Sequence, residues 1–167
     1  MADLAPSERL QPSLLDRLED DEPDKRVEPV ERRVLSLERL KESVIRDLSW
    51  LLNCENLTPV HDFQDYPDAA TSTVNFGVPP HSGLVLNRGQ RSELEEKLRE
   101  SIVRFEPRLI GSTVRVAAVV NETDTSSNAL RFEIEATMWA QPLPLQLMVN
   151  AEIDPQTGNL SVQEPAQ

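Results

Sequence analysis

Apolar side chains recur at helical spacing in two stretches of the chain. From Pro29 to Asn53 they fall three and four positions apart, which predicts an amphipathic helix. Its apolar face consists of Leu37, Leu40, Val44, Leu48 and Leu51. Its solvated side consists of Arg39, Lys41, Glu42, Arg46 and Asp47. A second helix is predicted over residues 88–105, with an apolar face formed by Leu94, Leu98, Ile102 and Phe105.

The pattern changes to a period of two after this second helix. Alternating apolar positions run through residues 112–120, 130–139 and 143–154, and polar residues occupy the positions between them in the middle stretch. Polar or proline-containing connections separate the three stretches, as expected for antiparallel strands joined by hairpins. The sequence therefore predicts an α+β fold: a small antiparallel sheet of three or more strands packed against two main helices.

The N-terminal residues have a different composition from the rest of the chain. Residues 1–30 hold nine acidic and four basic side chains with four prolines, a composition that favours a flexible segment. We therefore divide the chain into a flexible acidic segment (1–28), one domain (29–162) and a short tail (163–167). The long connection over residues 54–90 is rich in proline and glycine, which favours a functional or interface role.

One apolar motif interrupts the acidic segment. Leu14, Leu15 and Leu18 fall on one side of a short amphipathic turn within "PSLLDRL", residues 12–18. Such a turn can dock back on its own domain or on a partner. Partner docking is the favoured interpretation, because exposed apolar clusters in a solvated segment usually have a binding use.

Charge and composition exclude several function classes. Acidic residues number 29 against 17 basic, giving a formal charge of -12, which repels nucleic acid and anionic lipid. The single cysteine, Cys54, cannot form an internal disulfide, and together with His61 and His81 it makes no recognisable metal-ligand pattern. No apolar run is long enough to span a membrane and no secretory signal is apparent. A cytoplasmic protein without metal or cofactor is expected.

The charged tripeptide Glu106-Pro107-Arg108 is the strongest candidate site. Proline ends the preceding helix and fixes the backbone, so both flanking side chains project from a rigid junction. They could form a catalytic acid with its partner, a structural ion pair, or a contact for another protein. A glycosidase needs a second carboxylate at a defined distance, and none can be assigned. Structural or interface roles are therefore favoured over catalysis.

Four motifs in order resemble the TssE family, the baseplate subunits of bacterial type VI secretion systems, which are related to the wedge proteins of contractile phage tails. They are "PSLLDRL", "RRVLSLERLKESVIRDLSWLLN", "VNFGVP" and "RFEPRLIG". Phe76 departs from the family, which more often has tyrosine at this position. The resemblance extends from about residue 10 to 162.

The resemblance implies a non-enzymatic subunit in a membrane-docked baseplate, despite the family's lysozyme-like label. The implied partners are the wedge subunits TssF, TssG and TssK and the sheath subunits TssB and TssC. It further implies that Glu106, Pro107 and Arg108 serve contact with the sheath and that the leucine motif contacts the wedge core. A sheet edge that accepts strands from another chain fits this role. The alternative from a different class is a peptidoglycan hydrolase with Glu106 as general acid.

Overall fold

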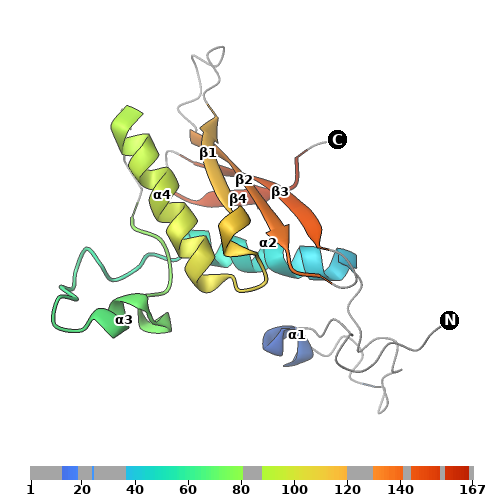
Figure 1. Cartoon of the computed structure of the whole chain (residues 1–167), viewed down its shortest axis with the longest axis horizontal. Helices are drawn as coiled ribbons and strands as arrows, with labels where there is room; N and C mark the ends of the chain where they lie inside the picture. Colours follow the sequence, from blue (N-terminus) through green and yellow to red (C-terminus); the bar gives the residue numbers. More distant parts are fainter. Residues whose placement is uncertain are drawn as a thin grey trace.

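The computed structural model describes residues 13–18, 24, 37–80, 88–119, 130–140, 144–154 and 157–165. Figure 1 shows a sheet with long helices packed against it and short helices at its periphery. The helices are α1 (Leu14–Leu18), α2 (Leu37–Asn53), α3 (Pro67–Thr71) and α4 (Arg88–Phe105), with single turns η3 (Thr73–Asn75) and η4 (Gly111–Thr113). The strands are β1 (Arg115–Val119), β2 (Leu130–Met138), β3 (Leu145–Ile153) and β4 (Leu160–Gln163).

The sheet is antiparallel and its strands lie in the order β1-β2-β3-β4. The predicted α+β class is therefore confirmed. In β2 the inward-facing positions, Phe132, Ile134, Ala136 and Met138, are all buried, as the alternating pattern requires. Ile134 lies opposite Val149 of β3, so the register places the apolar sets of both strands on the same face.

Both long helices pack on the sheet through the apolar faces that the sequence predicts. The buried residues of α2 include Leu40, Val44, Leu48, Leu51 and Leu52. Those of α4 include Leu94, Leu98 and Ile102. Helix α4 lies along β1 and α2 lies against β4, so each outer strand of the sheet has a helix beside it. Burial of these apolar faces stabilises the packing of both helices on the sheet.

The predicted elements and the observed ones agree closely where both can be compared. Helix α4 has the predicted bounds, and α2 is described from Leu37 because residues 29–36 lie outside the described part of the chain. The same holds for most of the acidic segment and for His81. The segment 71–79 contributes a turn and one bridge, Glu55 to Val78. No helix of the described residues is both long and apolar enough to cross a membrane.

Candidate partner-binding site

The tripeptide follows α4 directly and lies beside the C-terminal end of β2. Backbone hydrogen bonds fix it on both sides. The amide of Glu106 completes the last turn of α4 by donating to the carbonyl of Ile102 (2.9 Å). After Pro107 the chain turns, and the carbonyl of Arg108 accepts from the amide of Trp139 (2.7 Å). Proline cannot continue a helix, so the sequence itself places this junction. The predicted end of the helix is confirmed at Phe105.

Glu106 and Arg108 pair with each other inside the chain. Arg108 Nε donates to Glu106 Oε1 (2.7 Å) and Arg108 Nη2 to Oε2 (2.5 Å), a bidentate arrangement of the kind that gives strong charge-assisted bonds. The backbone amide of Arg108 also donates to Oε1 (3.1 Å). Glu106 is only 3% exposed, whereas 22% of the Arg108 side chain remains exposed. The Glu106 carboxylate is thus buried, and the partly exposed side chain of Arg108 lies over it.

Two residues of α2 complete the surroundings of Arg108. Nη2 lies 2.6 Å from Asp47 Oδ2, and Nη1 donates to the hydroxyl of Ser43 (2.8 Å). Burial alone would lower the pKa of Arg108, but its hydrogen bonds and charge attraction to Glu106 and Asp47 raise that pKa above its ordinary value. Each nitrogen of the guanidinium end group therefore has a partner within the chain.

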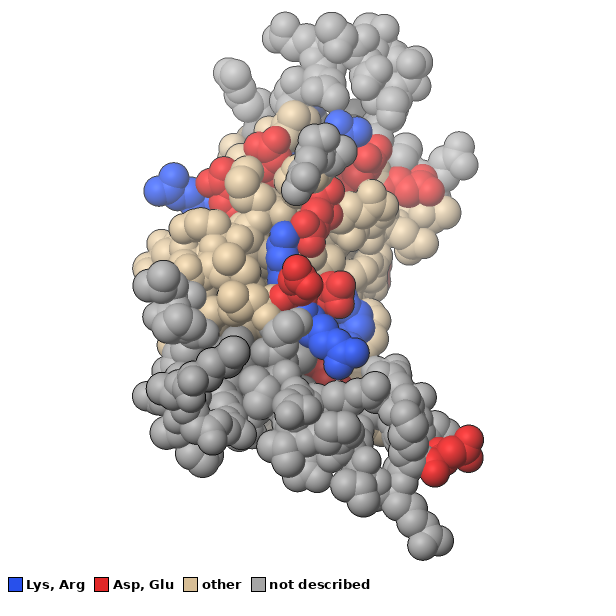
Figure 2. Space-filling model, turned by 90° about the vertical axis from the view of Figure 1, so that its right-hand side faces the viewer, with Lys and Arg blue, Asp and Glu red and all other residues tan. Residues whose placement is uncertain are grey.

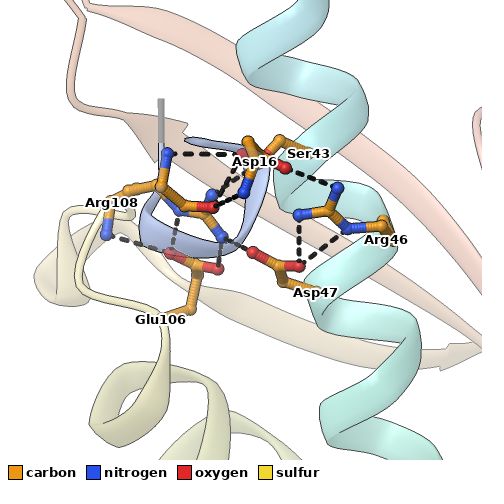
Figure 3. A network of polar contacts seen from close by, with 7 residues as sticks. Asp16, Ser43, Arg46, Asp47, Glu106 and Arg108 are labelled. Atoms are coloured by element: carbon orange, nitrogen blue, oxygen red, sulfur yellow. Dashed lines mark hydrogen bonds and ion pairs between the residues drawn. The ribbon is translucent and has the colours of Figure 1, made fainter. Parts of the chain in front are cut away.

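Asp47 connects this pair to a second arginine and to α1. Its Oδ1 lies 3.0 Å from Arg46 Nη2, and Arg46 Nη1 in turn lies 2.5 Å from Asp16 Oδ1. Ser43 closes a ring, since its hydroxyl accepts from Arg108 and donates to Asp16 Oδ2 (3.0 Å). Figure 3 shows this arrangement, in which side chains from α1, α2 and the tripeptide meet. We call the six side chains Asp16, Ser43, Arg46, Asp47, Glu106 and Arg108 the charge network.

The charge network corrects one prediction from the sequence. Arg46 and Asp47 were expected on the solvated side of α2, but their side chains keep only 32% and 24% exposure and take part in the network. A charged residue next to an apolar stripe cannot be assigned to solvent when its partners come from other elements. Ser43, placed between the apolar positions of α2, was the one local signal in the sequence that polar contacts occur here.

The leucine motif forms helix α1, which the charge network holds against α2. Asp16 is the anchor: burial raises its pKa, but hydrogen bonds from Ser13, Arg46 and Ser43 outweigh this and lower the pKa to about 2. Leu15 and Leu18 are 48% and 74% exposed. The side chain of Leu14 lies outside the described part of the structure. Polar contacts therefore dock the helix, while two of its leucines face solvent.

Side chains from the helices bind the outer backbone of both edge strands. On β4, Asn53 Nδ2 donates to the Leu160 carbonyl (2.7 Å) and Asn53 Oδ1 accepts from the Leu160 amide (2.8 Å). On β1, one oxygen of Glu95 accepts from the amide of Ala118 (2.8 Å). These side chains take the place that a neighbouring strand would have, which limits uncontrolled edge pairing.

Other candidate groups stay separate from this site. Cys54 is half-buried with its sulfur near the Phe76 carbonyl (3.7 Å), and His61 is exposed. Within the described residues, no group of three or more potential ligands is arranged to hold a metal. On the face shown in Figure 2, acidic and basic side chains alternate rather than gather by sign. The described residues of that face form no extended basic surface of the kind that nucleic acids require.

Comparison with known proteins identifies the family. The model of the family described as baseplate wedge protein gp25 matches residues 38–143, which include the tripeptide but not α1 or β4. A comparison with curated proteins gives no match. Among solved structures, the chain is similar to a protein of Geobacter sulfurreducens assigned as a tail lysozyme, at 16% identity and a TM-score of 0.46 over 69% of this chain and 92% of that one. Because the family model matches more than half of the sequence, the chain belongs to the baseplate wedge protein gp25 family.

Proposed function

We propose that this protein is a structural, non-enzymatic baseplate subunit of a type VI secretion system. It joins the baseplate wedge and nucleates assembly of the contractile sheath. Membership of the baseplate wedge family supports the first part of this role. The motifs that resemble TssE support the specific system, with TssF, TssG and TssK as wedge partners and TssB and TssC as sheath partners. The proposed location is the cytoplasm, in a baseplate docked at the membrane.

The observation that carries the proposal is the meeting of two sites that lie far apart in the sequence. The leucine motif on α1 and the tripeptide at 106–108 are joined through Asp16, Ser43 and Arg108. The tripeptide contributes mainly by position, because its charges are satisfied inside the chain. Leu15 and Leu18, which are exposed in the free chain, then supply the apolar contact. Binding energy concentrates on apolar side chains that lose their water when a partner covers them.

For sheath nucleation we assign strand addition to the outer edge of β1. Within the described residues, a partner strand at β1 replaces the bond from Ala118 to Glu95, whereas at β4 it replaces both bonds of Asn53. Val116 lies two residues before Ala118, so its amide points to the same outer edge. An incoming strand can bond there without breaking the ladder to β2.

Proline substitution tests this assignment with a matched control. Val116→Pro removes the outward amide of β1, and Val162→Pro removes the equivalent amide of β4. With a fluorescent TssB as reporter in living cells, we expect Val116→Pro to abolish sheath formation and Val162→Pro to retain it. Circular dichroism must first show that both variants fold. Normal sheaths with Val116→Pro, or their loss only with Val162→Pro, would contradict the β1 assignment.

Co-purification tests the wider proposal independently of the edge. The full chain, co-expressed with TssF, TssG and TssK, is expected to purify with them. Leu15→Ser/Leu18→Ser should release it while leaving its unfolding midpoint unchanged, because both side chains are exposed. Failure of the native chain to co-purify would refute the wedge role.

The hydrolase alternative has its own test. It predicts that the purified protein clears cell-wall peptidoglycan and that the Glu106→Gln variant does not. We expect no clearing by the native protein or by the variant.

A further inference from the structure

The connection between α2 and α4 carries an exposed apolar surface that the proposed function does not use. We call residues 55–76 the protrusion; Figure 1 shows its helix α3 lying beyond the end of α4, away from the sheet. Val60, Tyr66 and Val74 expose 72%, 69% and 67% of their surface. Among the large hydrophobic side chains of the described residues, only Leu18 exposes more. Three such side chains within one short segment favour an interaction role for it.

Internal hydrogen bonds fix the backbone of the protrusion. Asn75 is buried, and its Oδ1 accepts from the amide of Leu57 (2.9 Å) while its Nδ2 donates to the carbonyl of Ala70 (3.0 Å). This one side chain joins the beginning of the protrusion to the end of α3. Helix α3 itself buries none of its residues. These polar contacts help to fix the shape of the protrusion, and its most exposed apolar side chains remain accessible to a partner.

The base of the protrusion is tied firmly to the core. Phe76 packs edge-on against Phe105 of α4, with ring centroids 5.1 Å apart. Gly77 follows at a φ of +121°, and a Cβ added there would lie 2.2 Å from the carbonyl oxygen of Cys54. Only glycine fits this close approach. The protrusion is thus presented in a fixed direction, which lowers the entropy cost of docking.

The charges of the protrusion indicate the chemistry of its partner. Asp62, Asp65 and Asp68 are exposed, and the segment 55–76 contains no lysine or arginine. A symmetric contact between two copies would bring the aspartates of one protrusion against those of the other, and the formal charge of -12 adds to that repulsion. Nucleic acid and anionic lipid are repelled for the same reason.

We propose that the protrusion is a docking surface for a protein partner that presents lysine or arginine side chains around an apolar recess. Tyr66 and Val74 enter the recess, and the aspartates face the basic groups at its rim. This arrangement of an apolar centre inside a polar rim is the usual anatomy of a specific interface. The surface is separate from the charge network and from the edge of β1, so it contributes a third contact in the assembly.

Site-directed crosslinking tests the proposal in the full chain. A photoreactive phenylalanine (p-benzoylphenylalanine) at Tyr66 replaces one aromatic ring by another, and the same group at Glu100, an exposed position on α4, serves as control. In cells that assemble baseplates, we expect a crosslink from position 66 to a lysine- or arginine-rich segment of another protein. Adding Asp65→Lys and Asp68→Lys to the variant with the photoreactive group at position 66 should reduce the yield of this crosslink at least tenfold. The same two substitutions should leave the crosslink yield from the control position, 100, unchanged.

Each other outcome overturns the proposal. Absence of a crosslink from position 66 in assembled baseplates means that the protrusion stays free. A crosslink to a second copy, or to a segment without basic residues, means that the occupant has a different chemistry. A crosslink that survives the charge reversal means that the aspartates do not select the partner. The variants Asp65→Lys/Asp68→Lys should still co-purify with TssF and TssG, because the proposed wedge contact depends on α1. This measurement therefore distinguishes a failure of the protrusion proposal from a failure of the wedge proposal.

Discussion

Replacing Arg108 by methionine is expected to destabilise the domain more than removing Arg108 and Glu106 together. The single substitution leaves the Glu106 carboxylate, 3% exposed, without its bidentate partner. Breaking a buried ion pair from one side costs about 3–5 kcal/mol. Because 22% of the Arg108 side chain is exposed, water can hydrate part of the site, so we expect the lower end, about 3 kcal/mol.

The double variant Glu106→Gln/Arg108→Met removes the isolated charge. The glutamine still leaves an imperfectly paired buried amide, for which about 1–2 kcal/mol is the expected cost. The two substitutions are therefore strongly coupled, and the second partly restores what the first removes. Against a total stability of about 5–15 kcal/mol for a domain of this kind, all variants stay measurable.

Urea unfolding followed by tryptophan fluorescence measures these differences. Trp50 is a suitable reporter, because the Arg46 guanidinium of the charge network lies 5.0 Å from its ring centroid. Arg131→Met is the matched control: its partner Glu152 is 3.2 Å away and both side chains are 41% exposed, so a loss below about 1 kcal/mol is expected. If Arg108→Met costs no more than this control, or if the double variant is the least stable, the account of a buried carboxylate fails.

Three further predictions concern α1, the protrusion and the edge of β4. Asp16→Asn should release α1 from α2, which faster proteolysis within residues 13–18 would reveal. In the native chain, the ionised Asp16 stabilises the docked α1 by an amount on the order of 2 kcal/mol, because its pKa is lowered. This stabilisation should be present above pH 4 and lost as the pH falls toward 2. Gly77→Ala should lower the unfolding midpoint far more than Gly111→Ala, because its Cβ would meet a backbone carbonyl at 2.2 Å in a positive-φ conformation, whereas at Gly111 the nearest atom is a valine methyl at 3.0 Å. Asn53→Ala leaves both backbone groups of Leu160 unpaired, so it should cost about 1–3 kcal/mol and promote self-association detectable by light scattering.

The main elements could be predicted from the sequence because each has a strong period of its own. Helices α2 and α4 and strands β1 to β3 follow from apolar spacing alone. Helix α3 was not predicted, since a five-residue helix with no buried side chain leaves no apolar period. Strand β4 was not predicted either, because four residues, Leu160–Gln163, are too few for alternation to stand out. Both elements depend on contacts with other parts of the chain, from Asn75 at α3 and from β3 and Asn53 at β4.

The candidate site was predicted only in part, for a related reason. Pro107 revealed a rigid junction, and Glu106 and Arg108 were recognised as its charged flanks. Their partners could not be predicted, because Asp47 lies on another helix and pairs with Arg108 only once α2 and α4 have packed on the sheet. Sequence spacing shows which charges share an element. It does not show which charges meet between elements.

The charge network also limits how the tripeptide can act on a partner. The nitrogens of the Arg108 guanidinium and both oxygens of Glu106 are engaged inside the chain, so a direct ionic contact would have to replace an existing bond. Arg46 is the more accessible cation, at 32% side-chain exposure, and Asp16 of α1 occupies it. Helix α1 and residues 106–108 are therefore joined by one network of contacts. Ser43 binds both Asp16 of α1 and Arg108, so a displacement of α1 would remove one bond from a side chain that holds Arg108.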